Sequence, residues 1–176
     1  MADVLVQEVL DAMRESVEFH DSGLTDIQVT ATWYALCATV RGVPDALFGL
    51  RNMTADAGET LLTFYWVRGG VFGCMEVLKP ADTDSSAPAT RGWLRPLAGL
   101  RKVDVEAEVY QPSRMLHSEL GVKSKISLHW DDSGKPAVVL DATGSMNTSA
   151  RPPLEKLIEL VLDGVAQTAP SAGRPQ

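Results

Sequence analysis

The chain has 176 residues, and its content of 45% hydrophobic, 22% charged and 6% aromatic residues is typical of a globular domain and excludes a disordered, collagen-like or disulfide-rich chain. Its 23 acidic residues outnumber its 16 basic ones, and the net charge of −7 argues against a nucleic-acid partner, because phosphate binding needs clustered lysine and arginine. We expect a single domain over residues 1–169, followed by a disordered tail over residues 170–176.

Two segments near the ends of the chain have the apolar spacing of amphipathic helices. Residues 3–20 form the first, and Gly23 follows them as a residue that commonly closes a helix. Pro152 and Pro153 open the second, which continues to about Gln167. The apolar stripes are Val6, Val9, Leu10, Met13 and Val17 in the first segment, and Leu154, Leu157, Ile158, Val161 and Val165 in the second.

Residues 26–41 alternate between apolar and polar side chains with a period of two, which predicts one long strand that bends midway. The apolar positions on one side are Ile27, Val29, Ala31, Trp33, Ala35 and Cys37. Residues 46–53 are ambiguous. Pro44 suits the first turn of a short helix, whereas the flanking strands favour a further strand.

Two aromatic and β-branched runs, residues 59–68 and 71–79, flank Gly69 and Gly70 and predict an antiparallel hairpin with a tight glycine turn. If Arg68 lies opposite Val71, the hairpin has two defined faces. The first face carries Leu62, Phe64, Trp66, Met75 and Val77, and the second carries Thr63, Tyr65, Val67, Phe72, Cys74 and Glu76. The first face is expected in the core. The second is also mostly apolar, so a helix, a cavity or a partner is expected to lie against it.

The rest of the chain predicts a long mobile loop at residues 80–91, a short helical turn at 97–101, a strand at 102–110, and a second hairpin from the runs 123–130 and 136–141. The expected architecture is therefore α+β: a mainly antiparallel sheet of six or seven strands with N-terminal and C-terminal helices packed on it.

An acidic stripe is the first candidate site. Along residues 102–110, Asp104, Glu106 and Glu108 alternate with Val103, Val105, Ala107 and Val109, so we expect one acidic side and one buried side. The acids could simply be solvated, or they could bind a ligand or a partner. If residues 123–130 form the neighbouring strand, Lys125 and His129 can pair across to these acids.

Glu76 is the second candidate. A carboxylate among Tyr65, Phe72 and Cys74 would be desolvated and its pKa raised, as in a buried proton donor. The alternative is an edge position at which Glu76 reaches water. Glu76 and Tyr65 are thus the candidate catalytic residues, and Phe72, Glu106, Glu108 and His129 the candidate binding residues.

No cofactor or metal site is expected. Cys37 and Cys74 are too far apart in sequence for a Cys-x-x-Cys motif, and they are interpreted as buried reduced thiols. No stretch of 18 apolar residues occurs, and the acidic start of the chain lacks the basic residues of an export signal. We therefore expect a cytoplasmic protein that does not bind membranes.

Two classes of function remain open. The first is a non-catalytic cytoplasmic protein-binding module, such as an adaptor, a chaperone or an immunity-type partner, whose acidic and partly apolar sheet face attracts a basic protein. The second is a small enzyme or carrier, in which the hairpin of residues 59–79 lines a mostly apolar pocket for a small hydrophobic ligand. A homodimer that buries the second hairpin face is a third hypothesis.

Overall fold

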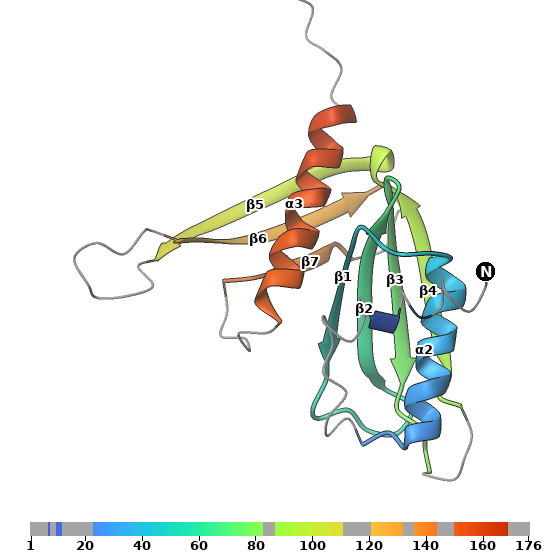
Figure 1. Cartoon of the computed structure of the whole chain (residues 1–176). Helices are drawn as coiled ribbons and strands as arrows, with labels where there is room; N and C mark the ends of the chain where they lie inside the picture. Colours follow the sequence, from blue (N-terminus) through green and yellow to red (C-terminus); the bar gives the residue numbers. More distant parts are fainter. Residues whose placement is uncertain are drawn as a thin grey trace, which may run out of the picture.

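The computed structural model describes residues 7, 10–11, 23–82, 87–110, 121–131, 136–143 and 150–168. In these ranges the chain forms two antiparallel sheets and two long helices (Figure 1). The predicted N-terminal helix lies outside the described residues except for residues 7, 10 and 11, and the predicted tail lies outside them entirely.

The first sheet has four strands and the second has three, each in the order of the sequence. The strands of the first sheet are β1 (Ala46–Arg51), β2 (Thr60–Arg68), β3 (Val71–Leu78) and β4 (Thr90–Pro96). Those of the second are β5 (Leu100–Tyr110), β6 (Gly121–Trp130) and β7 (Val138–Asp141). The prediction of an antiparallel α+β fold is confirmed, but its strands form two sheets instead of one.

The connection between the sheets is the short 3-10 helix η1 (Leu97–Gly99), close to the predicted helical turn. Residues 46–53, which were ambiguous, contain strand β1. Strand β4 was not predicted, and it begins at Thr90, inside the stretch expected to be a loop. Strand β4 lies at the edge of the sheet, where backbone hydrogen bonds to β3 hold it in place. Such a strand can form without the strong apolar pattern on which a sequence prediction depends.

The predicted strand at residues 26–41 is wrong, because this segment is helix α2 (Asp26–Val40). Its start is a capping box, in which the Thr25 N–H donates to Gln28 Oε1 at 3.0 Å and the Gln28 N–H donates to Thr25 Oγ1 at 3.4 Å. Thr25 and Gln28, three residues apart, were a local helix signal in the sequence, but the prediction rested on the alternating pattern alone.

The buried residues of α2 recur every four positions, as expected for one helix face. They are Gln28, Thr32, Leu36 and Val40. The two polar members are satisfied locally: Gln28 belongs to the capping box, and the Thr32 hydroxyl donates to the Gln28 carbonyl at 2.8 Å. Because half of this face is polar, hydrophobicity alone did not reveal the helical period.

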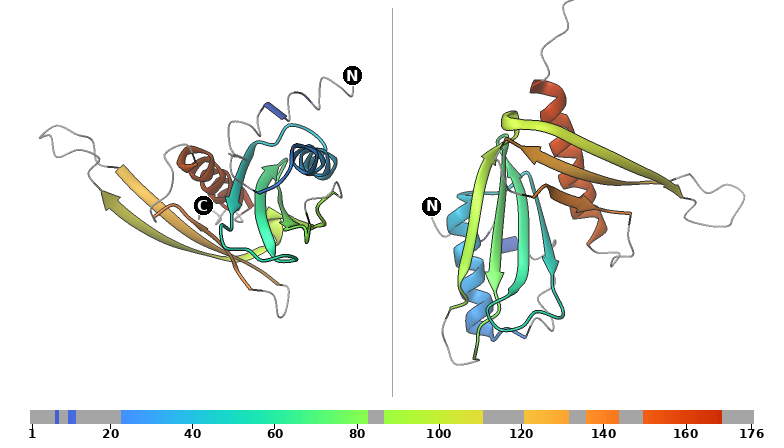
Figure 2. Two further views of the ribbon diagram at one scale, coloured as in Figure 1. Left: turned by 90° about the horizontal axis from the view of Figure 1, so that it is seen from below. Right: turned by 180° about the vertical axis from the view of Figure 1, so that it is seen from behind.

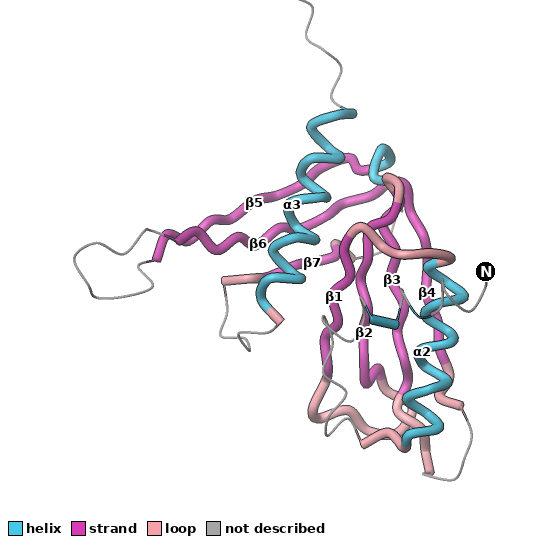
Figure 3. The backbone as a smooth tube through the Cα atoms, viewed as in Figure 1, coloured by secondary structure: helices cyan, strands magenta, loops and turns pink. Residues whose placement is uncertain are grey.

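The hairpin of β2 and β3 is confirmed in its predicted register, with Arg68 opposite Val71. Gly69 and Gly70 have φ angles of 54° and 77°, which glycine adopts without strain. Each face of the hairpin is covered by a different helix. Figure 2, in its left view, shows α2 and α3 (Arg151–Thr168) on opposite sides of the first sheet, and Figure 3 shows α2 running along the strands.

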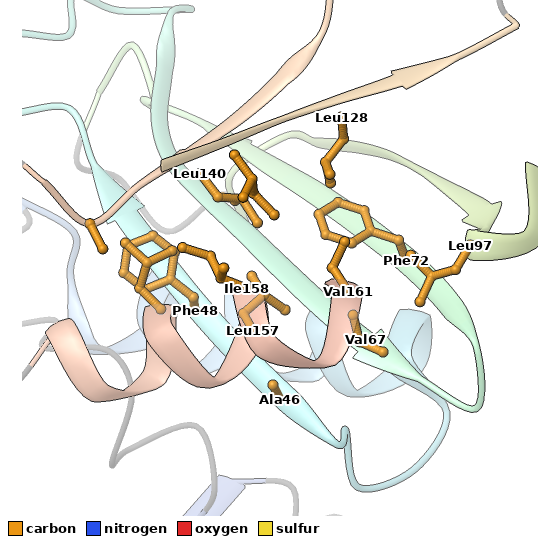
Figure 4. Packing of buried hydrophobic residues seen from close by; sticks show 13 residues of the cluster. Ala46, Phe48, Val67, Phe72, Leu97, Leu128, Leu140, Leu157, Ile158 and Val161 are labelled. Carbon is orange, nitrogen blue, oxygen red and sulfur yellow. The ribbon is translucent and has the colours of Figure 1, made fainter. Parts of the chain in front are cut away.

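Two hydrophobic cores result. The first lies under α2, where Leu36 packs with Phe64 and Trp66 of the hairpin. The second lies between the two sheets, where α3 packs on Phe48 and Val67 of the first sheet and on Ile126, Leu128 and Leu140 of the second (Figure 4). The predicted C-terminal helix is confirmed, and its apolar stripe, including Leu157, Ile158 and Val161, faces this second core.

Replacement of Gly73 by alanine is expected to destabilise the fold by about 3 kcal/mol, because it overpacks the first core. Gly73 lies opposite Trp66, and an added Cβ would lie 2.1 Å from Trp66 Cε2. Gly99→Ala is the matched control, since its Cβ would lie 3.6 Å from Pro96 Cγ, an ordinary contact. Urea unfolding of both variants tests this, and equal stability would contradict the packing of Trp66 over Gly73.

Candidate functional site

Phe72 lies at the centre of the second face of the hairpin. Its side chain is fully buried, and its ring centroid lies 5.9 Å from those of Tyr65 and Trp93 and 5.6 Å from that of Trp130. The guanidinium of Arg95 lies 4.2 Å from the Trp93 ring centroid, within cation–π range. Phe72 therefore belongs to an aromatic cluster that joins the two sheets.

Glu76 and Tyr65 share this face, as predicted from the alternation, but Glu76 is not isolated among apolar groups. It forms an ion pair with Arg91 of β4, and 32% of its side chain is exposed. The desolvation that the sequence suggested for Glu76 is thus relieved by water and by a cation. Glu76 therefore reaches water, as in the alternative, although β3 lies between β2 and β4 and is not an edge strand.

Tyr65 lies opposite Cys74 in the hairpin, and burial raises the pKa of both groups to about 12. The nearby charge of Glu76 contributes to this raised pKa in both groups. At neutral pH the phenol and the thiol therefore stay protonated. Cys74 is a buried free thiol and lacks the thiolate character that a nucleophile needs.

The acidic side of β5 forms a charge ladder with β6, which confirms the predicted cross-strand pairing. Lys125 Nζ lies 3.2 Å from Glu106 Oε1, and His129 Nε2 lies 3.0 Å from Asp104 Oδ2. A hydrogen bond from Lys102 is the main cause of a lowered pKa for Asp104. In the register, Glu108 lies opposite Lys123. This face is an array of opposite charges in contact with water.

The other face of the second sheet differs from its prediction. Val105 and Val109 were expected to be buried, yet their side chains are 54% and 62% exposed. Val122, which was not singled out from the sequence, is 56% exposed. Ile126 and Leu128 lie on the same face and are fully buried beneath α3. Figure 1 shows the reason: β5 and β6 extend well past α3, so neither α2 nor α3 lies over their outer part. We call Val105, Ala107, Val109 and Val122 the arm face.

A groove of about 350 Å³ lies next to the arm face, between β6 and α3. Its residues are Val122, Ser124, Glu155, Ile158, Glu159, Leu162 and Asp163. The valine, isoleucine and leucine side chains form an apolar floor, and the three α3 carboxylates form an acidic rim. We call this the α3–β6 groove. Only the apolar stripe of this helix was singled out from the sequence, and the three acids gave no signal of their own beyond their spacing of four residues.

A second shallow groove, of about 370 Å³, runs over the outer side of α2 and includes Ile27 and Tyr34. Within the described residues, no group of three His, Cys, Asp or Glu side chains is placed to hold a metal ion. No described helix combines the length and apolar character needed to cross a membrane. The sequence matches no known family model, and no curated protein or solved structure is significantly similar to it.

The raised pKa of Tyr65 predicts a loss of stability at alkaline pH. Its contribution is present below pH 10, the ordinary phenol pKa, and is lost as the pH rises through about 12, because the unfolded chain ionises first. Tyr65→Phe should therefore make the unfolding free energy fall less steeply above about pH 10. Urea unfolding at a series of pH values tests this. Tyr34→Phe, at a 63% exposed tyrosine, is the control, and equal slopes for wild type and Tyr65→Phe would contradict the prediction.

Proposed function

We propose that the chain is a non-catalytic cytoplasmic protein-binding module, of the adaptor, chaperone or immunity type, that binds its partner on the arm face and in the α3–β6 groove. The observation that supports this is the exposure of Val105, Val109 and Val122, each more than half accessible, beside an apolar groove. Contiguous exposed apolar surface of this kind is typical of interaction sites, because it lowers the free energy when a partner covers it.

The proposal places the binding surface on a different face of the second sheet from the one the sequence suggested. Glu106 and His129 lie on the charge ladder, where basic or acidic neighbours already compensate their charges. An ion pair exposed to water contributes little binding energy, whereas burial of apolar side chains contributes about 25 cal/mol per Å². The apolar face therefore offers the larger gain on association.

A cytoplasmic location is supported by the state of the two cysteines. Cys37 and Cys74 are free thiols, and Cys74 is buried. Free thiols are typical of reducing compartments, whereas small secreted domains commonly use cysteine in disulfides.

The enzyme or carrier alternative has less support. A pocket lined by the hairpin would need Phe72 on its wall, but the ring is enclosed by three other aromatic rings. Its candidate proton donor, Glu76, is paired with Arg91. The homodimer remains as an outcome of the following experiment.

A photo-crosslinking amino acid at Val122 is expected to capture a discrete partner protein in the native host. The same probe at Ile27, which is 63% exposed on α2, is expected to capture none. The purified partner should then bind the double variant Val109→Ser, Val122→Ser about tenfold more weakly, as measured by titration calorimetry, since two valines lose apolar burial.

Val43→Ser, Val139→Ser is the matched control, because these valines are 43% and 44% exposed away from the arm face, and its affinity should stay within about twofold of wild type. Equal crosslinking at both probe positions, or none at Val122, would overturn the proposal. Capture of a second copy of the chain would replace it with self-association through the arm face, a different dimer from the one that buries the second hairpin face.

A further inference from the structure

We infer that the segment bound in the α3–β6 groove is a basic amphipathic α-helix, with one apolar face and a row of lysine or arginine residues beside it. This inference rests on the protein-binding function proposed above and specifies the chemistry of its partner. The groove, the acids on its rim and the exposed valines next to it each restrict what can bind there.

The acidic rim sets the charge of the occupant. Glu159 and Asp163 form no ion pair with any residue the structure describes. Glu155 forms one long ion pair on its own helix, with Oε1 at 3.8 Å from Arg151 Nη1. The whole chain carries a net charge of −7. A second copy would bring acids against acids at this rim, which opposes association, whereas a basic partner is attracted.

The spacing of the rim suits a helix packed along α3. Glu155, Glu159 and Asp163 recur every four residues, so they lie on one side of α3 and are separated by about 6 Å along its axis. A second helix lying alongside presents its own residues at i, i+4 and i+8 with the same rise, and basic residues at these positions can meet each acid in turn.

The floor of the groove favours a helix over a strand. It consists of side chains from the face of β6 and from α3, chiefly Val122, Ile158 and Leu162. An extended segment in this place would lack partners for its backbone N–H and C=O groups, whereas a helix satisfies its own. The apolar face of such a helix would cover the floor and the neighbouring valines.

Two synthetic peptides of about 14 residues and identical leucine and lysine composition test the inference. One arranges leucine with the helical period, as Leu-Lys-Lys-Leu-Leu-Lys-Leu-Leu-Lys-Lys-Leu-Leu-Lys-Lys, and the other alternates leucine and lysine to favour a strand, so that each has seven of both residues. Fluorescence anisotropy with the full chain should show the helical-period peptide binding about tenfold more tightly than the alternating one.

The triple variant Glu155→Gln, Glu159→Gln, Asp163→Asn should bind the helical-period peptide about tenfold more weakly than wild type. The control variant Asp104→Asn, Glu106→Gln, Glu108→Gln removes the same number of charges from the opposite face of the second sheet, and should change the affinity less than about twofold. Circular dichroism of both variants confirms that they remain folded.

Equal losses in the two variants would show unspecific charge attraction and overturn the inference, and so would tighter binding of the alternating peptide or no binding of either. These failures differ from failure of the proposed function. If the Val122 probe captures a partner that lacks a basic helix, the binding function stands and this inference falls. If the probe captures nothing, the function itself fails.

Discussion

The hairpin of β2 and β3 imposes the main constraint on this fold, because both of its faces are apolar and water must be excluded from each. Phe64 and Trp66 point to one side, and Val67 and Phe72 to the other. A sheet with two apolar faces needs a layer on both, which is why α2 covers one face while α3 and the second sheet cover the other.

The exposed arm face follows from the same constraint. Helix α3 is shared, since one of its sides packs on the first sheet and another on the second. It buries Ile126 and Leu128, but the outer parts of β5 and β6 extend beyond it. The apolar alternation of β5 continues outward to Val105 and Val109, so the strand carries apolar surface past the reach of α3.

The two faces of the second sheet differ in whether their side chains already have partners within the chain. This difference decides which face is suited to binding. On one face, Glu106 and Asp104 already have cationic partners from β6 or from their own strand. On the other, Val105, Val109 and Val122 are each more than half exposed among the described residues, and Val122 also lines the α3–β6 groove with its acids. A partner gains most where apolar surface and uncompensated charge lie together.

Local patterns in the sequence were enough to predict the β2–β3 register and the C-terminal helix, because each depends on residues close in sequence or on strict alternation. The pairing of Lys125 with the acids of β5 was predicted only if β6 lies beside β5, and the structure supplies that neighbour. The same patterns failed for α2, whose buried Gln28 and Thr32 obscure the helical period, and for Val105 and Val109, whose alternation predicted a buried side. Alternation shows which residues share a face. What lies against that face is decided by the tertiary structure, because it depends on how far α3 reaches over the second sheet.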